Sequence, residues 1–287
     1  PDAILCRSDH EVTDDITDKI VVHCDVAARG VITVPTVSSV YEVPLILEEQ
    51  GLGDLIVETL GIGTTGRDMA GWRQMVEMIN TPKESLSIAV VGKYVDLHDS
   101  YISVKEALLH AGLYHNRDID VQWVPSEEVE QEGPDWFLNS ACGIVIPGGF
   151  GPRGVEGMIE TVKYARDHEV PYLGLCLGMQ VMVVESSRNK LGMRRANSTE
   201  FDPNTPDPVI DLMPDQKDVE QMGGTMRLGV YPCRVVDGSW AAKAYGQSEV
   251  LERHRHRFEF NNAYREALES VDLWPTGLSP DGRLVEI

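Results

Sequence analysis

From residue 86 onward, short apolar runs alternate with segments whose apolar residues recur at helical spacing. Residues 88–92 form an apolar run that ends in glycine, as expected of a buried strand, and a helix is predicted behind a cap at Asp99 or Ser100. The alternation continues with strands expected at 119–124, 143–146 and 172–175 and helices at 155–167 and from Leu177. Strands and helices joined by short links predict an α/β fold, a doubly wound open parallel sheet with helices on both faces.

The first 59 residues form part of a second α/β unit. A β-branched run at 31–34 is typical of a strand, and the apolar segment 40–47 ends at Gly51, a helix stop signal. Residues 60–85 contain a glycine-rich stretch, a short helical pattern and the helix-breaking pair Thr81-Pro82. We therefore expect one domain over 1–59, a linker over 60–85 and a second domain over 86–287.

The charge balance is strongly acidic and excludes two classes of partner. The 287 residues carry 46 Asp+Glu against 25 Lys+Arg, for a net charge of −21. Such a surface repels nucleic acid phosphates and anionic lipid headgroups, so we expect no nucleic acid and no membrane as a partner. No run reaches the ~18 apolar residues of a transmembrane helix, and the first residues lack a secretory signal.

Cysteine and histidine usage indicates the compartment and excludes a metal centre. The five cysteines are widely spaced, odd in number and without a C-x-x-C pair, which indicates a reducing compartment rather than a disulfide framework. The eight histidines are scattered, with no H-E-x-x-H motif. We expect a cytoplasmic protein with no metal site in this segment.

Residues 174–180 read Gly-Leu-Cys-Leu-Gly-Met-Gln, with an expected strand before Cys176 and a helix directly after it. This is the cysteine counterpart of the G-x-S-x-G nucleophile elbow, where glycines permit a tight turn. The helix N-terminus favours a thiolate, so Cys176 is a candidate nucleophile. The alternative is a buried structural cysteine, which is the better interpretation for the other four.

A second glycine-rich turn, Pro-Gly-Gly-Phe-Gly at 147–151, follows another expected strand. Its exposed backbone N–H groups could hold a developing oxyanion beside the thiolate, although a plain tight turn also fits the pattern. Both turns leave the carboxyl ends of parallel strands, where ligands bind in open α/β sheets.

The third feature is Glu-Arg-His-Arg-His-Arg-Phe-Glu at 252–259. Clustered arginines on so acidic a chain fit a site for a carboxylate or phosphate, which guanidinium groups bind in a bidentate way. A solvated strand face with alternating Arg and His fits the pattern equally well.

Together these motifs closely resemble the CTP synthase family. The resemblance covers essentially the whole chain, and the order and spacing of the motifs also match. The motifs that carry it are 147–151, 174–180, Asn-Ser-Thr-Glu at 197–200, Gly-Gly-Thr-Met-Arg-Leu-Gly at 223–229, 253–259, and in the front piece 4–9 and 40–44. The elbow alone would indicate only a class I glutamine amidotransferase, a flavodoxin-like domain. The front piece resembles the end of the family's P-loop-type α/β synthetase (amidoligase) domain.

The resemblance implies the chemistry of the site. Cys176 would attack the side-chain amide of glutamine and release ammonia, with an oxyanion hole formed by the N–H groups of Gly149 and Leu177. The glutamine-binding positions that match are Gly149, Leu177, Gly178, Met179, Gln180, Glu200 and Arg257. Glu200 would hold the α-ammonium group of glutamine and Arg257 its α-carboxylate.

The family's synthetase reaction is implied in the same way: ATP with Mg²⁺ phosphorylates UTP, and ammonia displaces the phosphate to give CTP. The matching nucleotide-binding residues are Arg7, Lys19, Thr36 and Val37. GTP as an allosteric activator, CTP as a feedback inhibitor and a homotetramer are further implications.

Two departures from the family leave other functions open. No G-x-x-x-x-G-K-[ST] occurs, so ATP and Mg²⁺ would be bound mainly by a preceding part, and the sequence ends before the family's His-x-Glu. Glu286 is not that glutamate, and His254 and His256 lie in a different motif. We therefore expect the domain to lack its C-terminal end and the segment alone to be inactive. The alternatives are a non-catalytic glutamine-binding or regulatory module, or the glutaminase domain of another class I amidotransferase.

Overall fold

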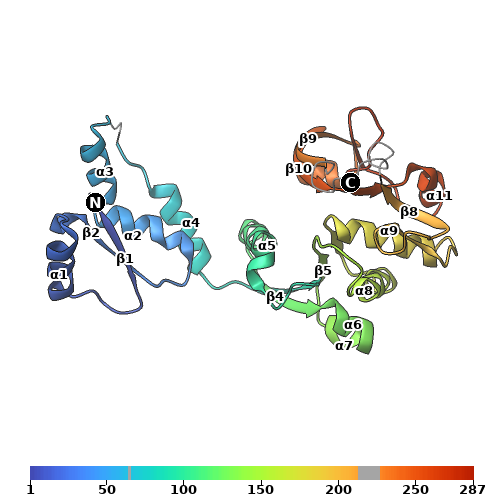
Figure 1. Cartoon of the computed structure of the whole chain (residues 1–287), viewed down its shortest axis with the longest axis horizontal. Helices are drawn as coiled ribbons and strands as arrows, with labels where there is room; N and C mark the ends of the chain where they lie inside the picture. Colours follow the sequence, from blue (N-terminus) through green and yellow to red (C-terminus); the bar gives the residue numbers. More distant parts are fainter. Residues whose placement is uncertain (64–65, 213–226) are drawn as a thin grey trace. The chain divides into compact units, whose positions relative to one another are not determined.

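The computed structural model describes residues 1–63, 66–212 and 227–287, which form two compact units, Pro1–Glu84 and Ser85–Ile287 (Figure 1). Of the linker predicted over 60–85, residues 60–84 fall in the first unit. The elements of the first unit are β1 (Ile4–Ser8), α1 (Asp14–Cys24), β2 (Val31–Pro35), α2 (Val43–Glu49), α3 (Leu52–Leu60) and α4 (Ala70–Asn80).

The second unit begins with alternating strands and helices, as the sequence predicts. These elements are β3 (Ser85–Gly92), α5 (Ile102–Tyr114), β4 (Asp118–Pro125), α6 (Ser126–Glu132), α7 (Asp135–Leu138), β5 (Gly143–Ile146), α8 (Val155–Asp167), β6 (Tyr172–Gly174) and α9 (Leu177–Asn189). The strands form one sheet in the order β4-β3-β5-β6 with every neighbouring pair parallel. With β3 as the first strand this is the order of a flavodoxin-like fold, so the predicted α/β class with an open parallel sheet is confirmed.

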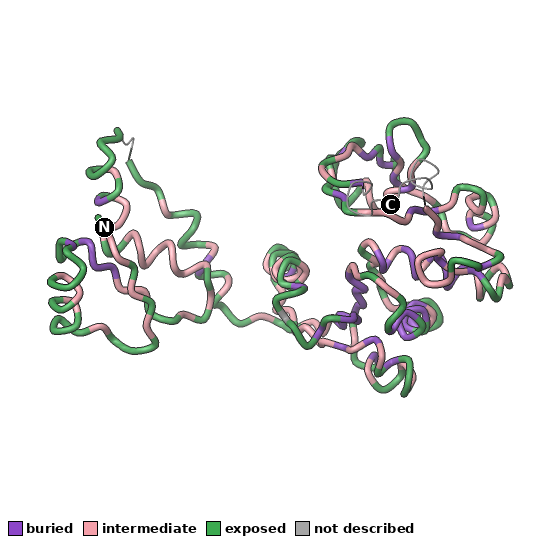
Figure 2. Tube along the Cα trace, viewed as in Figure 1, coloured by how far each residue is buried: buried purple, intermediate pink, exposed green. Residues whose placement is uncertain are grey.

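The core of the second unit lies between this sheet and its helices. The apolar residues at 89–91 of β3 and 144–146 of β5 are buried, as are Leu177, Val181, Val183 and Val184 of α9, and Figure 2 shows the purple trace concentrated along α8 and α9. The apolar residues with the least exposure are Ala89, Val90, Val91, Ile144, Ile146, Met158, Leu177, Val181 and Val184. Strands buried on both faces explain why the sequence shows continuous apolar runs rather than an alternation of apolar and polar residues.

The strand order reverses direction between β3 and β5. From β3 the chain first crosses to β4 on one side, and it then returns to place β5 on the other side. In open α/β sheets the carboxyl ends of strands at such a switch point leave a crevice where ligands bind. Two segments therefore begin at this crevice: the one after Gly92 and the glycine-rich turn after Ile146.

Beyond α9 the chain forms shorter strands that the sequence does not predict. They are β7 (Ala196–Ser198), β8 (Asp207–Leu212), β9 (Arg227–Val235), β10 (Glu249–His256), β11 (Phe258–Phe260) and β12 (Gly277–Leu278), with helices α10 (Trp240–Tyr245) and α11 (Arg265–Glu269). One sheet has the order β11-β8-β7 and another, antiparallel, the order β10-β9-β12. Polar residues interrupt these strands, so hydrophobic periodicity does not reveal them.

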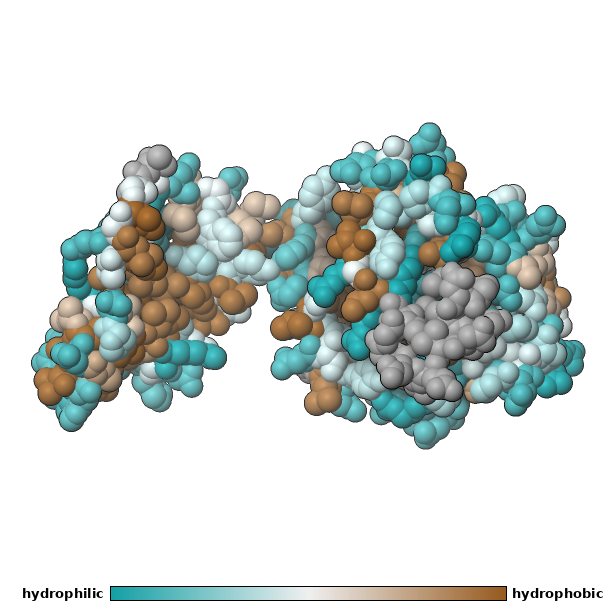
Figure 3. All heavy atoms as spheres, turned by 45° about the horizontal axis from the view of Figure 1, so that its top comes forward, coloured by the Kyte–Doolittle hydropathy of each residue, from teal (hydrophilic) through white to brown (hydrophobic). Residues whose placement is uncertain are grey.

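The first unit is built on the parallel pair β1 and β2, in register from Ile4 with Val31 to Ser8 with Pro35. Few of its apolar residues are enclosed, and Figure 3 shows hydrophobic surface gathered across this unit. Its exposed large apolar residues are Leu5, Ile16, Val22, Val40, Ile56, Leu60, Ile62, Trp72 and Met78.

One local expectation about the second unit is wrong. The helix α5 begins at Ile102 behind a short 3₁₀ turn, with Tyr101 at the cap position and no side-chain cap hydrogen bond. Neither Asp99 nor Ser100 caps it, because both lie within that 3₁₀ turn.

Candidate active site

Cys176 lies at a sharp turn between β6 and α9, in a backbone conformation that is strained for a residue with a side chain. Its φ is 55° and its ψ is −102°, and it occupies the cap position of α9. Backbone strain of this kind is concentrated at functional sites, where the surrounding structure holds it in place. The side chain is partly buried rather than enclosed in the core, which separates Cys176 from a structural cysteine such as Cys233.

The two glycines of the motif allow this turn to exist. A Cβ atom on Gly174 would lie 2.6 Å from the carbonyl oxygen of Gly178, and a Cβ on Gly178 would overlap the carbonyl oxygen of Ile146. The same carbonyl of Ile146 accepts a 2.9 Å hydrogen bond from Leu175 N–H. The hydroxyl of Tyr172 donates to the carbonyl of Gly178 at 2.7 Å and ties strand to helix. Strand and helix therefore approach too closely for any residue larger than glycine.

The glycine-rich turn after β5 lies directly beside the cysteine. A Cβ on Gly148 would lie 3.4 Å from the Cβ of Cys176 and 3.7 Å from its sulfur. The backbone N–H groups of Leu177 and Gly149 act on the thiol and lower its pKa. The expected pair of oxyanion donors is thus brought to the same atom, from two different turns.

Opposing effects act on the Cys176 thiol. Burial raises its pKa, and the carboxylates of Glu200 and Glu259 act in the same direction, whereas the N–H groups of Leu177 and Gly149 lower it. The net direction is upward, so the thiolate needs help from donors that face the sulfur.

A cavity of about 420 Å³ opens beside Cys176. Its lining combines one thiol, one carboxylate, two guanidinium groups and aromatic rings. The lining residues are Gly149, Phe150, Cys176, Gln180, Glu200, Arg255, His256, Arg257 and Phe258. A cavity with a nucleophile at one side and both signs of charge suits a small zwitterionic substrate.

Backbone contacts hold two polar side chains of this cavity, Glu200 and Gln180. Glu200 accepts a 2.7 Å hydrogen bond from Gly151 N–H, which fixes one of its carboxylate oxygens. Gln180 donates from its side chain to the carbonyl of Phe258 at 3.1 Å and joins α9 to β11. Among the described residues, the buried Nε of Arg257 has no hydrogen-bond partner. An unpaired buried donor of this kind lowers the stability of the fold unless a ligand accepts a hydrogen bond from it.

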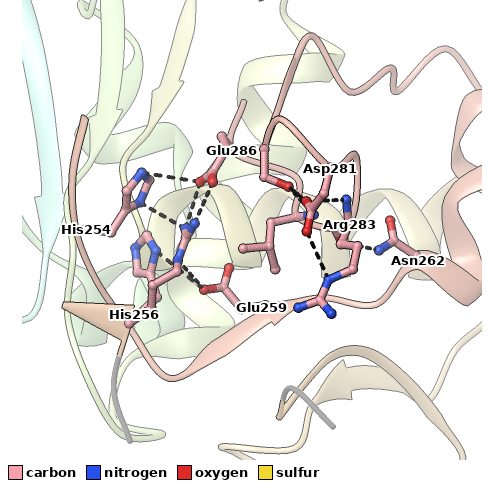
Figure 4. A network of polar contacts seen from close by, with 10 residues as sticks. His254, His256, Glu259, Asn262, Asp281, Arg283 and Glu286 are labelled. Carbon is pink, nitrogen blue, oxygen red and sulfur yellow. Dashed lines mark hydrogen bonds and ion pairs between the residues drawn. The ribbon is translucent and has the colours of Figure 1, made fainter. Parts of the chain in front are cut away.

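Behind β10 lies a network of buried charged groups (Figure 4). Arg227 of β9 binds Glu286 through both terminal nitrogens, at 2.5 and 2.7 Å, and its Nε lies 3.1 Å from Glu259. The same guanidinium donates to Nδ1 of His254 at 3.0 Å, so that nitrogen carries no proton. The side chains of Arg227, Glu286 and Glu259 are at most 6% exposed.

The Arg/His block is therefore divided between two roles. His254 points to the buried network, whereas Arg255 and Arg257 line the cavity, with Arg255 above the ring of Phe150 at 5.7 Å. Burial lowers the pKa of His256 to about 4, and burial raises the pKa of Glu259 to about 7. Neither of the two explanations that the sequence leaves open, a cationic site or a solvated strand face, describes the whole block.

Sequence reasoning misses Lys93, which follows Gly92 at the end of β3. Its side chain is 4% exposed, and its ammonium group donates to the carbonyls of Phe150 and Gly151 in the glycine-rich turn. The available signal is its place directly after the first strand of the sheet, at the switch point.

The residues expected to bind nucleotides lie in the first unit. Arg7 is on β1, and Thr36 follows β2, where its N–H donates to the carbonyl of Ser8 at 3.1 Å. Lys19 is on α1, where it forms an exposed ion pair with Asp15 at 2.5 Å. Arg7, Thr36 and Val37 therefore gather at the carboxyl ends of a parallel strand pair, whereas Lys19 lies on the following helix.

Comparison with known proteins identifies the family. The model of the class I glutamine amidotransferase family matches residues 96–287. The chain belongs to this family. A second family model, the CTP synthase N-terminus, matches residues 1–62.

Relatives named CTP synthase match the whole chain. A CTP synthase of Dehalococcoides mccartyi is 54% identical over 287 residues, and one of Chloroflexus aurantiacus is 57% identical over 286 residues. Both alignments include 100% of this chain but only 53% and 52% of the relatives, so the chain spans about half their length. The resemblance to the CTP synthase family is confirmed.

A solved amidotransferase structure is also similar. It is described as the glutaminase domain of Trypanosoma brucei CTPS with bound acivicin, and it shares 38% sequence identity with a TM-score of 0.65. The match covers 70% of this chain and 79% of that one. The amidotransferase fold predicted from the sequence is confirmed by this similarity.

The structure gathers most, but not all, of the expected amidotransferase residues around one cavity. Gly149, Cys176, Gln180, Glu200 and Arg257 line it, whereas Leu177, Gly178 and Met179 form the first turn of α9 beside it. In the block 223–229, residues 223–226 lie outside the described part of the chain.

Two features are absent from residues 1–63, 66–212 and 227–287: a metal-binding cluster and a membrane-spanning helix. Among the described residues, no three or more His, Cys, Asp or Glu side chains lie close enough together to hold a metal ion. Every helix among those residues is too short or too polar to cross a membrane.

Proposed function

We propose that this chain supplies the glutamine-hydrolysing site, together with the end of the synthetase domain, of a CTP synthase. The observation that carries the proposal is the strained Cys176, beside a cavity of mixed charge, with N–H groups of Gly149 and Leu177 at its sulfur. Similarity to CTP synthases along the entire chain supports this amidotransferase over others.

The first step is attack by the Cys176 thiolate on the side-chain carboxamide of glutamine. An S–C bond forms, the C=O bond opens to an oxyanion, and the N–H groups of Gly149 and Leu177 donate to that oxyanion. Collapse of this intermediate breaks the C–N bond, and the nitrogen takes up a proton and leaves as ammonia. Water then hydrolyses the thioester to glutamate. The family's His-x-Glu pair would move these protons.

Charge complementarity supports the binding mode. The α-ammonium group of glutamine would lie at Glu200, whose carboxylate is fixed by Gly151 N–H at 2.7 Å. The α-carboxylate would complete the unpaired Nε of Arg257. Gly178, Met179 and Gln180 in the first turn of α9 would bound the substrate.

The synthetase half is proposed from the family. ATP would phosphorylate O4 of UTP, and ammonia would displace the phosphate to give CTP. In this chain Arg7 would contact nucleotide phosphates, Lys19 the pyrimidine nucleotide, and Thr36 and Val37 the adenine. The gathering of Arg7, Thr36 and Val37 at the strand ends fits such a ligand. The described residues contain no cluster of three or more carboxylate, His or Cys side chains that could hold Mg²⁺, so we assign none of them to that ion.

Three further properties complete the proposal. GTP would activate the glutaminase, CTP would inhibit the enzyme, and the complete protein would be a cytoplasmic homotetramer. Ammonia produced at Cys176 would be consumed in the synthetase domain.

Covalent labelling tests the glutaminase site. The protein is incubated with acivicin, and the peptide that contains Cys176 is analysed by mass spectrometry, with excess glutamine as competitor. An adduct on Cys176 that glutamine suppresses is expected, and Arg257→Met should reduce labelling. Labelling of Cys142 or Cys24 in its place would contradict the proposal. Binding of glutamine without any Cys176 chemistry in the full-length protein would favour the non-catalytic alternative.

A further inference from the structure

Lys93 is a buried ammonium group that the proposed reaction does not use. It lies at the switch point of the sheet, is 4% exposed and is not among the residues that line the cavity. Burial lowers its pKa to about 8, with the Glu200 carboxylate opposing that effect. A charged group is rarely buried unless it is paired with an opposite charge or hydrogen-bonded.

The partners of Lys93 are backbone carbonyls of the glycine-rich turn. Its Nζ donates to the carbonyl of Phe150 at 3.1 Å and to that of Gly151. The N–H of Gly151 belongs to the same peptide unit as the Phe150 carbonyl, and it donates to Glu200 at 2.7 Å. The peptide unit is planar, so anchors at its oxygen and at its nitrogen together fix the plane.

The stem of the lysine contacts the adjacent position. A Cβ on Gly149 would lie 3.2 Å from Leu177 Cδ2 and 3.5 Å from Lys93 Cδ. The side chains of Lys93 and of the first residue of α9 therefore both lie close to Gly149. The lysine's own carbonyl accepts a 2.7 Å hydrogen bond from Arg153, which anchors its backbone.

We propose that Lys93 is a positioning residue of the glutaminase site. Its ammonium group fixes the Phe150–Gly151 peptide, and through that peptide it orients the Glu200 carboxylate and the Gly149 N–H beside Cys176. The inference deepens the proposed function, since Glu200 and the Gly149 N–H are the groups that would hold the substrate and its oxyanion.

Loss of the ammonium group has a defined consequence. The carbonyls of Phe150 and Gly151 would lose the Lys93 amino group, which can donate to them in its charged and in its neutral form, and the peptide would gain by turning them toward water. Such a turn removes the Gly151 N–H from Glu200 and lets the Gly149 N–H move away from the sulfur. The Cys176 thiol would then face Glu200 and Glu259 with fewer donors, and its pKa would rise.

The test compares Lys93→Met with Lys105→Met, a matched substitution at an exposed position on α5. Iodoacetamide alkylates thiolates with release of iodide, so its rate against pH, followed on the Cys176 peptide by mass spectrometry, gives the titration midpoint of that thiol. The exposed Cys142 in the same samples is the internal control. Circular dichroism and the thermal midpoint verify folding, and Lys93→Gln replaces Lys93→Met if the latter does not fold.

In Lys93→Met the Cys176 midpoint should rise by about one pH unit, equivalent to about tenfold less thiolate at a fixed pH. It should not move in Lys105→Met, and Cys142 should be unchanged in both. A folded Lys93 variant whose Cys176 midpoint equals that of the parent would overturn the inference.

Acivicin separates positioning from a simple charge effect. Loss of position should raise the half-saturating acivicin concentration about tenfold as well as slow alkylation, because Glu200 loses its orientation. A slower reaction at an unchanged half-saturating concentration would contradict positioning. If the parent protein itself shows no glutamine-sensitive labelling, the proposed function fails, while the iodoacetamide result still decides the role of Lys93.

Discussion

At the scale of single residues, the reactive geometry at Cys176 depends on atoms that are missing from its neighbours. At Gly174 and Gly178 the backbones of β6 and α9 lie so close that a methyl group would not fit between them. Gly148 leaves room for the Cys176 sulfur. This close approach of β6 and α9 keeps Cys176 at a φ of 55°. The strain is maintained because the surrounding core is rigid.

A methyl group at Gly178 tests this close approach. In Gly178→Ala the Cβ would overlap the Ile146 carbonyl, so we expect the second unit to lose about 3 kcal/mol or more of its free energy of unfolding. A urea titration measures the change. Gly71→Ala, on α4 where a Cβ meets no atom within 4 Å, is the control and should leave the second unit's midpoint unchanged. Equal free energies of unfolding for the parent and Gly178→Ala would show that Gly178 does not lie this close to the Ile146 carbonyl.

The pH dependence of stability tests the burial of His256. Its pKa is lowered from 6.5 to about 4, so the unfolded chain binds the proton first as the pH falls. The contribution of neutral, buried His256 to the free energy of unfolding is fully present above pH 6.5. It is lost as the pH falls from 6.5 to 4, and the loss is up to about 3 kcal/mol.

Replacement of the imidazole measures that contribution. Across this pH range His256→Gln should lose less stability than the parent in urea titrations, whereas His115→Gln, at an exposed position, should behave as the parent does. An identical acid response in the parent and His256→Gln would contradict the burial. The variants are compared with the parent, because Glu259 also changes the free energy of unfolding of the parent over this pH range. Its pKa is raised to about 7, so its contribution runs in the opposite direction and decreases from pH 4.5 to 7.

At the scale of elements, β9 and β10 separate a buried charged network from an exposed face. Arg227, at the start of β9, joins Glu286, Glu259 and His254. Leu228 and Val230 on the same strand are each 63% exposed. Alternate residues of one strand thus face opposite sides, as strand geometry requires.

Removal of Arg227 tests the network. Arg227→Met leaves two buried carboxylates without their cation, and we expect a loss of about 3–5 kcal/mol in the free energy of unfolding. Arg234→Met is the matched control on the same strand, because its ion pair with Glu249 spans 3.7 Å and is 62% and 57% exposed. That control should cost less than about 1 kcal/mol. Similar costs for the two variants would show that the Arg227 network is not tightly buried.

Local patterns explain which elements the sequence predicts. The turn at Cys176, the glycine-rich turn and the apolar strands β3 and β5 each depend on residues adjacent in the chain, so their sequences predict them. Lys93 lies 57 residues from Phe150, and Arg227 lies 59 residues from Glu286. Pairs of this kind depend on how the sheets are arranged, and no local pattern encodes them. The resemblance, rather than periodicity, supplied the roles of Glu200 and Arg257.

At the scale of the whole molecule, the two units differ in how much apolar surface they enclose. The second unit has a large buried core beside a smaller cluster around Cys233, whereas the first unit leaves Val22 and Val40 77% and 69% exposed. Apolar residues exposed together lower the free energy gained on folding.

Separate expression tests this difference. Residues 85–287 should unfold in one cooperative transition with Cys176 still labelled by iodoacetamide. Residues 1–84 should bind a hydrophobic dye and show a broad transition. A sharp, dye-free transition for 1–84 would contradict the account of the first unit.

The central claim is that Cys176 is the nucleophile that releases ammonia for CTP synthesis. The most direct measurement is the rate of CTP formation by the full-length protein with Cys176→Ala, once with glutamine and once with ammonium salt as nitrogen source. The glutamine-supported rate should fall by about a thousandfold or more, and the ammonia-supported rate should stay within about twofold of the parent, because the thiolate serves only to release ammonia. A glutamine-supported rate equal to that of the parent would contradict the claim.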